Sequence, residues 1–219
     1  RYKMKICFLA SGGGGNFKFF NLAKKLELVK NIELFLIADR ECGSLEYAEN
    51  NDIYNKKINY KKYENIELLE ELDKIKPDII VTNWHKIIDT EVVNKYQGKL
   101  INLHYSLLPA FDGLIGVKPI QQAYEKNCSY VGTTCHYVDE GVDSGKIISQ
   151  AIIKTDVSID IAIQKIFEKG CLILLNSILQ LSNKELITKK ENNKFEYSPN
   201  LLFDDNQFDK FFWKKLSEE

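Results

Sequence analysis

Two polar side chains suited to catalysis stand close together near the middle of the sequence. Asn102 and His104 lie at the end of the apolar run KLINLH, residues 99–104, just before the chain turns at Pro109. Side chains alternate along a strand, so these two leave the same face, separated by two residue rises or roughly 7 Å. A polar pair at the carboxyl end of a buried strand is typical of an active site on an α/β sheet. Capping groups or satisfied core polar groups would use the same residues, so the pair alone leaves both interpretations open.

We expect a carboxylate from a later segment to join this pair. Asp143 lies in the sequence HYVDEGVDSG, residues 136–145, where flanking glycines allow a loop to hold the carboxylate against a site. Asn, His and Asp, with no Ser or Cys nucleophile among these three positions, indicate direct transfer of a group rather than a covalent enzyme intermediate.

A glycine-rich loop near the start of the chain could bind an anion. In the segment ASGGGGNF, Gly13, Gly14 and Gly15 are followed by Asn16 at the start of a predicted helix. Backbone N–H groups at a helix N-terminus, unobstructed by side chains, attract phosphate. The dinucleotide fingerprint is not met, because Phe17 stands at its third glycine, and the Lys-Ser/Thr pair of a P-loop is missing. The loop therefore suits a phosphorylated small substrate, although a turn for close helix–strand packing would use the same glycines.

The elements that must position these residues alternate in the first half of the chain. Continuous apolar runs predict strands, and helical spacing of apolar residues predicts helices between them. The strands are expected at 5–10, 32–38, 78–83 and 99–104, and the helices at 16–28, 65–75 and around 89–96. This alternation predicts a Rossmann-like, mostly parallel sheet with helices on both faces.

The pattern changes after Pro119. A helix over 120–126 is followed by strands at 129–138 and 146–153, joined by a polar turn, and by a long apolar helix over 158–182. We therefore expect an antiparallel addition to the sheet in the C-terminal part. Residues 1–182 are predicted to form the catalytic domain. Residues 183–219 are predicted to form a polar, aromatic C-terminal extension that either packs as a tail or serves for interaction.

Composition excludes several classes of protein. Thirty basic residues against 31 acidic ones offer no global field for nucleic acid or an anionic membrane. The longest apolar stretches are strand-sized, so we expect no membrane span. Five cysteines without a CxxC pair and three separated histidines predict no metal site. An odd number of cysteines favours a reducing compartment, and we expect the cytoplasm.

Two ordered motifs extend the interpretation. NLHYSLLPAFDG (102–113) and HYVDEGVDSGKIISQ (136–150) closely resemble the folate-dependent formyltransferase family, and the similarity runs from the glycine loop to about residue 180. This resemblance implies the formyltransferase fold and a catalytic trio of Asn102, His104 and Asp143. It also implies N10-formyltetrahydrofolate as the formyl donor and co-substrate, with no metal.

The residue types fit formyl transfer. An amine that attacks the formyl carbon creates a tetrahedral intermediate with a developing oxyanion. The Asn102 amide and a protonated His104 can stabilise that charge, and losing one such donor typically costs about a hundred- to thousandfold in rate. Asp143 can support the imidazolium and, through water, help to take the amine proton.

The resemblance also implies a folate pocket made from two segments. The first supplies apolar walls and backbone groups that read the pterin edge, and the second closes the other side. The residues expected to bind the cofactor are Trp84, Lys86, Ile87, Ile88, Val93, Val138, Asp139, Glu140 and Val142. Simple core packing is the alternative role for Trp84.

The acceptor is the least determined part of the reaction. The glycine loop resembles the phosphate loop of the purine-pathway relatives, with Asn16 in register, which favours a small phosphorylated amine over tRNA. Two departures weaken the purine interpretation: IGV (115–117) replaces a His-x-His stretch, and Gly170-Cys171 replaces Glu-His. We therefore expect a nucleotide-linked amino sugar as acceptor, as in the sugar N-formyltransferases.

Two other functions stay open. The first is phosphoribosylglycinamide formyltransferase activity. The second, from another class, is a catalytically silent module that binds folate or nucleotide. In each case the partners are small molecules, with no nucleic acid or membrane. A second copy of the chain is a candidate partner.

Overall fold

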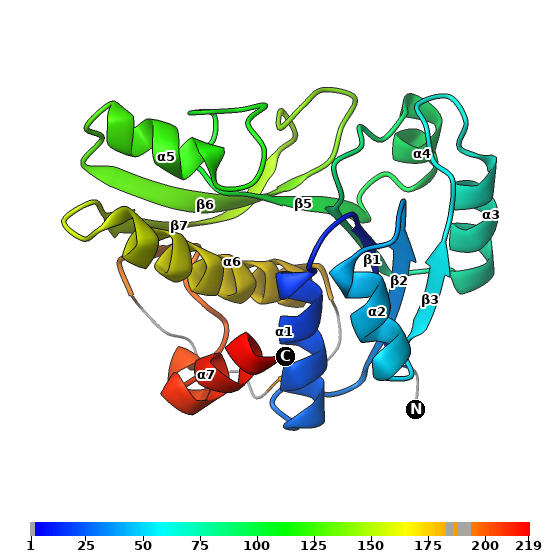
Figure 1. Cartoon of the computed structure of the whole chain (residues 1–219), viewed down its shortest axis with the longest axis horizontal. Coiled ribbons are helices and arrows are strands. Elements are labelled where there is room, and N and C mark those ends of the chain that lie inside the picture. The colour runs from blue at the N-terminus through cyan, green and yellow to red at the C-terminus, as the bar shows by residue number, and fades with distance from the viewer. Residues whose placement is uncertain (1–2, 183–185, 188–193) are drawn as a thin grey trace. The chain divides into compact units, whose positions relative to one another are not determined.

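The computed structural model describes residues 3–182, 186–187 and 194–219 of the chain. They form two compact units (Figure 1). The first runs as far as Asn102 and includes Glu219, and the second runs from Leu103 to Glu218. Among these described residues, no helix is long and apolar enough to cross a membrane.

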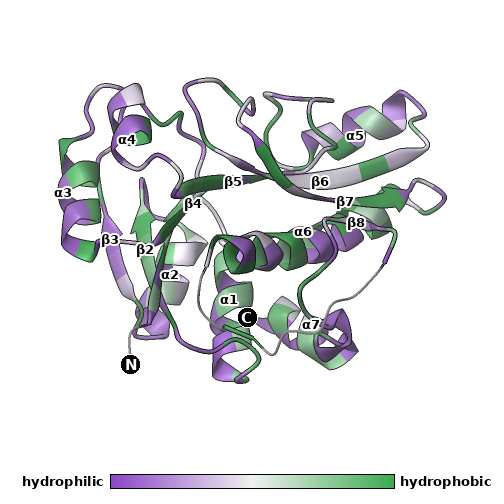
Figure 2. Cartoon of the chain, turned by 180° about the vertical axis from the view of Figure 1, so that it is seen from behind, coloured by the Kyte–Doolittle hydropathy of each residue, from purple (hydrophilic) through white to green (hydrophobic). Residues whose placement is uncertain are grey.

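The first unit is built on parallel strands in the order β3-β2-β1-β4-β5. The strands are β1 (Met4–Ala10), β2 (Ile32–Ala38), β3 (Tyr54–Lys57), β4 (Ile79–Asn83) and β5 (Leu100–His104), whose last two residues belong to the second unit. Strands β1, β2 and β4 are apolar and almost wholly buried, and Figure 2 shows β2 and β4 largely in green. The predicted parallel sheet is confirmed.

Four helices accompany these strands: α1 (Gly15–Lys25), α2 (Gly43–Asn50), α3 (Ile66–Ile75) and α4 (Thr90–Lys95). The steps from β1 to β2 and on to β3 move one way across the sheet, whereas the step from β3 to β4 returns past β1. Because such crossovers are right-handed, α1 and α2 cover one face and α3 the other. Figure 1 shows α1 and α2 next to each other and α3 apart from them. The predicted helices on both faces are confirmed.

The sequence patterns did not predict α2 and β3. Strand β3, with the sequence YNKK, pairs only with β2 at the edge of the sheet and leaves most of its side chains exposed. Figure 2 shows it in purple. An edge strand of this kind needs no apolar run, so hydrophobic periodicity cannot reveal it.

The second unit contains antiparallel strands. Strand β6 (Tyr130–Tyr137) pairs with β7 (Ile147–Lys154), and β7 pairs with the short β8 (Tyr197–Ser198). The helices are α5 (Lys118–Glu125), α6 (Ile159–Leu181) and α7 (Lys210–Glu218), with a 3₁₀ turn at Asp205–Gln207. The predicted antiparallel addition in the C-terminal part is confirmed.

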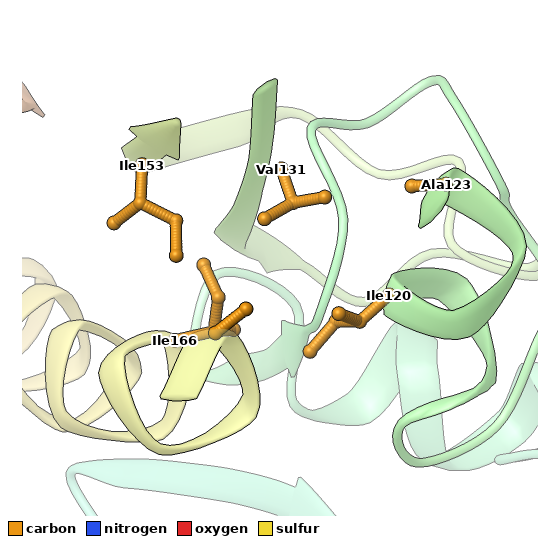
Figure 3. Packing of buried hydrophobic residues seen from close by; sticks show 6 residues of the cluster. Ile120, Ala123, Val131, Ile153 and Ile166 are labelled. Carbon is orange, nitrogen blue, oxygen red and sulfur yellow. The ribbon is translucent and has the colours of Figure 1, made fainter. Parts of the chain in front are cut away.

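An apolar cluster joins α5, β6, β7 and α6 within the second unit. Figure 3 shows side chains from all four elements pointing toward one another. The buried members are Ile120, Ala123, Val131, Ile153, Ala162 and Ile166. Helix α6 starts at Ser158, whose side chain caps the Ile161 N–H, and its middle is fully enclosed, as its apolar sequence predicts.

Residues 194–218 of the C-terminal segment belong to the same unit. Asn176 in α6 binds this segment through both polar atoms of its side-chain amide. Its Nδ2 donates to the Asn200 carbonyl (3.2 Å), and its Oδ1 accepts from the Leu202 N–H (2.8 Å). The predicted boundary after residue 182 falls where residues 183–185 and 188–193 lie outside the described residues. A separate extension over 183–219 therefore stays a prediction.

The glycine loop is tightly packed at one position. Gly14 caps α1 in the left-handed region (φ 69°), and a Cβ there would lie 2.6 Å from the Ser44 Cβ in α2. Ser44 also binds the loop, because its N–H and Oγ both donate to the Gly12 carbonyl at 3.0 and 2.7 Å. A Cβ on Gly13 would meet nothing within 4 Å. Gly14 therefore serves helix–helix packing, whereas Gly13 has open space beside it.

We expect Gly14→Ala to lower the free energy of unfolding by about 2 kcal/mol, because it adds both backbone strain and a clash with Ser44. Gly13→Ala is the matched control and should change that energy by no more than about 0.5 kcal/mol. Urea unfolding of the three proteins measures both values. Equal effects of the two substitutions would show that the loop is not packed as described.

Candidate active site

A carboxylate lies between two imidazole rings in the second unit. Asp143 Oδ2 lies 3.3 Å from His104 Nδ1, and its Oδ1 lies 3.6 Å from His136 Nε2. The Gly113 N–H also donates to Oδ2 at 2.9 Å. All three side chains are largely buried. The structure thus brings together His104 and Asp143, two members of the predicted trio, and adds His136.

The outer nitrogen of each ring faces a backbone carbonyl. His104 Nε2 lies 3.0 Å from the Phe111 oxygen, and His136 Nδ1 lies 2.8 Å from the Tyr137 oxygen. A carbonyl only accepts hydrogen bonds, so each outer nitrogen carries a hydrogen in this arrangement. The inner nitrogen then carries one only when the ring is doubly protonated. Asp143 is therefore the acceptor for an imidazolium formed on either side.

The charge of Asp143 is favoured by its partners. Burial by itself would raise the pKa of this carboxyl. The contact with the His136 side chain, the hydrogen bond from the Gly113 N–H and the attraction of an imidazolium at either histidine outweigh burial and hold the pKa of the carboxyl below its usual value. Asp143 is thus a carboxylate at neutral pH, even though its side chain is only 11% exposed.

A buried hydroxyl fixes the segment that follows His104. Thr134 Oγ1 donates to the Ser106 carbonyl (2.7 Å) and accepts from the Leu108 N–H (3.1 Å) and from Gln150 Nε2 (3.0 Å). Thr134 has no exposed surface. The segment after β5 is therefore tied to β6 by two hydrogen bonds to one side chain, which also receives a third from Gln150 in β7.

The neighbouring threonine holds the histidine itself. Thr133 Oγ1 donates to the carbonyl of His104 at 3.1 Å and is also fully buried. The backbone of His104 thus has a partner in β6, and its outer ring nitrogen has one in the Phe111 carbonyl. Residues 133 and 134 read as ordinary strand positions, so the sequence carried no signal of this role.

Asn102 is placed by its strand. It is half-buried in β5, two positions before His104, and the side-chain alternation of a strand puts both on one face. Asn102 belongs to the first unit and His104 to the second. The catalytic role of Asn102 stays a prediction.

The predicted phosphate loop lies in the first unit, where Gly15 opens α1. Asn16 is buried in the first turn, and its Oδ1 accepts from Asn83 Nδ2 at 3.1 Å. This side chain therefore ties the start of α1 to the end of β4. Phosphate binding by Gly13, Gly14, Gly15 and Asn16 stays a prediction.

The first predicted folate segment is organised by Tyr60, which the sequence analysis missed. The Tyr60 ring stacks on Trp84 at 4.8 Å, and its hydroxyl donates to the Ile87 carbonyl (3.1 Å) and accepts from the Asp89 N–H (3.0 Å). Trp84 Nε1 is buried with no hydrogen-bond partner among the described residues. The loop before α4 is therefore held by Tyr60, a residue that lies well before the loop in the sequence.

The other predicted folate residues differ in exposure. Ile88 and Val93 are buried, Ile87 is half exposed, and Lys86 Nζ lies 3.9 Å from Asp39. In the second unit Val138 is half-buried, whereas three further residues of that segment are exposed: Asp139, Glu140 and Val142. The two segments belong to different units, and their shared folate site stays a prediction.

The family is decided by comparison with known proteins. The family model described as formyl transferase matches residues 4–169, which include His104, Asp143 and His136. The chain belongs to the formyl transferase family. The family predicted from the two motifs is thereby confirmed.

Among the described residues, no group of three or more His, Cys, Asp or Glu could hold a metal ion.

Relatives of this formyl transferase come from two kinds of enzyme. Phosphoribosylglycinamide formyltransferase of Bacillus subtilis is 31% identical over 192 residues, which cover 82% of this chain and 97% of the relative. The chloroplastic enzyme of that name from Vigna unguiculata is 31% identical over 160 residues, covering 69% of this chain and 51% of the relative. Formyltetrahydrofolate deformylase of Haemophilus influenzae is 39% identical over 90 residues, covering 41% of this chain and 31% of the relative. The chain thus spans about half of the Vigna enzyme and about a third of the deformylase.

A solved structure supports the fold. Phosphoribosylglycinamide formyltransferase from Bacillus halodurans is 27% identical, with a TM-score of 0.73, and the match covers 84% of this chain and all of that one. The predicted formyltransferase fold is confirmed.

We expect Thr134→Val to lower the free energy of unfolding by about 3 kcal/mol, because the Ser106 carbonyl and the Leu108 N–H lose a buried partner and each unsatisfied group costs roughly 1–3 kcal/mol, whereas Gln150 Nε2 keeps its bond to the Leu108 carbonyl. Thr134→Ser keeps the hydroxyl and should lose less. Thr133→Val, which breaks the hydrogen bond to the His104 carbonyl, is the matched control. If chemical denaturation finds the two valine variants equally stable, Thr134 is not the centre of this network.

Tyr60→Phe should speed hydrogen exchange of the Asp89 amide about tenfold, because that N–H loses its acceptor, a change worth roughly 1.4 kcal/mol. Trp84→Phe keeps a ring on the other side of the stack and should leave the protection of this amide nearly unchanged. Amide exchange followed by NMR compares the two variants. An unchanged Asp89 amide in Tyr60→Phe would remove Tyr60 from the support of this loop.

Proposed function

We propose that this formyl transferase moves a formyl group from N10-formyltetrahydrofolate to a primary amine on a small phosphorylated acceptor. The observation that carries the proposal is the Asp143 carboxylate held 3.3 Å from His104 within a chain of this family. The buried ion pair supplies a charge beside the reacting carbon and an acceptor for the proton that the amine must lose.

In the proposed reaction, the amine attacks the formyl carbon and the carbonyl oxygen becomes an oxyanion. Asn102 donates its amide N–H to this oxygen, and His104, doubly protonated, stabilises it by charge. Both ring nitrogens of His104 already face acceptors, so a direct hydrogen bond from Nε2 would require it to leave the Phe111 carbonyl. Asp143, through water, takes a proton from the attacking amine and passes it to N10, so that the oxyanion re-forms the carbonyl and tetrahydrofolate leaves as a neutral amine when the C–N10 bond breaks.

The acceptor best supported by the relatives is phosphoribosylglycinamide. The Bacillus subtilis enzyme named for this substrate matches along nearly its whole length. A nucleotide-linked amino sugar, which the sequence analysis preferred, gains no support from the relatives. We therefore place phosphoribosylglycinamide first.

One observation keeps the amino sugar as the second candidate. Gly170 stands where the sequence comparison expects a carboxylate in purine-pathway enzymes. A Cβ at this position would lie 2.9 Å from Leu103 Cδ2 and 3.2 Å from Tyr105 Cε1. The place of that side chain is thus filled by two residues of the segment around His104, and a glutamate could not be accommodated without repacking.

An acceptor screen tests the proposal. The purified chain is incubated with N10-formyltetrahydrofolate and, separately, phosphoribosylglycinamide, a nucleotide-linked dideoxyamino sugar, and buffer alone. We expect formylation of phosphoribosylglycinamide, and at least about a hundredfold lower rate for His104→Asn, because the variant loses the charge beside the oxyanion.

Each other outcome identifies a different function. Faster formylation of the amino sugar would promote the second candidate. Release of formate without any amine would indicate the hydrolysis named for the deformylase relatives. Folate binding without turnover in any arm would leave a binding module and overturn the proposal.

A further inference from the structure

The loop that carries Asp143 is closed tightly at its base. It connects β6 to β7, and the Tyr137 N–H donates to the Lys146 carbonyl at 2.9 Å. A Cβ on Gly145 would overlap the Tyr137 carbonyl, so the last residue of the loop is pressed against the end of β6. The two ends of the loop are therefore fixed, and the question is what fixes its tip.

A single carboxylate oxygen gathers the tip of this loop. Asp139 Oδ1 accepts from the Gly141 N–H at 3.0 Å and from the Ser144 hydroxyl at 2.7 Å. A Cβ on Gly141 would collide with the Ser144 hydroxyl, so the chain passes this group closely. The hydrogen bond from Ser144 to Asp139 joins two residues that are five positions apart, and Asp143 lies between them.

The bridge bears on the backbone of Asp143 directly. Asp143 has φ 53°, a left-handed conformation that is uncommon for residues with a side chain, although Asp adopts it more readily than most. Ser144 is its immediate neighbour and is anchored across the loop. That anchoring fixes the direction in which the Asp143 carboxylate leaves the chain, toward the Gly113 N–H and the His104 ring.

We infer that the Ser144–Asp139 hydrogen bond is a brace that positions Asp143, and that Ser144 is a positioning residue for the proposed formyl transfer. The brace lies on the exposed side of the loop and takes no part in the buried contacts of Asp143. It acts by holding the loop in the one conformation in which this carboxylate reaches both imidazoles. This inference rests on the proposed function, but the position of Asp143 can be measured without it.

The first test separates rate from binding. Ser144→Ala should lower kcat about tenfold and change KM for the acceptor by less than twofold, whereas Ser144→Thr, which keeps the hydroxyl, should restore most of kcat. Ser217→Ala removes another exposed serine hydroxyl, bound to the Lys214 carbonyl in α7, and should leave kcat unchanged. Asp139→Ala combined with Ser144→Ala should cost little more than Asp139→Ala alone, because Asp139→Ala already removes the acceptor of the Ser144 hydroxyl together with that of the Gly141 N–H.

The second test reads the position of Asp143 without turnover. The Gly113 amide donates to the Asp143 carboxylate, so its NMR signal reports that contact. In Ser144→Ala this signal should move upfield and its hydrogen exchange should quicken at least fivefold, with the thermal midpoint nearly unchanged. In Ser144→Thr the signal should stay near its original position.

The outcomes distinguish the two proposals. An unmoved Gly113 amide in Ser144→Ala overturns the brace, whether or not the chain transfers formyl groups. A moved amide with wild-type kcat also overturns it, because the position of the loop would then not limit the reaction. A moved amide in a chain that transfers no formyl group keeps the brace as a positioning device and overturns the proposed function alone.

Discussion

Asp143 stays charged while mostly buried only because groups from three separate segments compensate for its loss of water. His104 comes from β5, the Gly113 N–H from the following loop and His136 from β6. Burying an unpaired carboxylate costs far more free energy than leaving it exposed at the surface. All three segments must therefore be in place if the unit is to fold with Asp143 ionised. The same contacts give the proposed chemistry its acceptor for a proton.

The segment that carries His104 is held by hydroxyl groups of strand β6. Thr133 and Thr134 are both fully buried and between them bind the carbonyls of His104 and Ser106. Side chains alternate along a strand, so adjacent threonines normally face opposite sides, yet these two bind carbonyls two residues apart in one segment. A buried polar network of this kind gains strength when every member is satisfied.

Much of this arrangement could be predicted from the sequence. Buried parallel strands have continuous apolar sequences. For this reason β2 was predicted with the bounds that the structure shows. His104 and Asp143 were predicted from residue type and from two ordered motifs. Helix α2 and strand β3 were not predicted, because neither has a clear apolar pattern. The roles of Thr134 and Tyr60 were missed for another reason. Each side chain binds backbone groups that only the tertiary structure brings near it.

The short strand β8 has a consequence for how the chain behaves among other copies of itself. Its pairing with Gln150 and Ala151, together with the bond from the Ile152 N–H to the Glu196 carbonyl, occupies the outer edge of β7. An open edge strand offers unpaired backbone groups to any extended chain nearby and is a template for aggregation. The segment that covers it lies beyond the residues matched by the family model. Protection of these positions of β7 from intermolecular β-pairing is thus supplied by residues that follow the region matched by the family model.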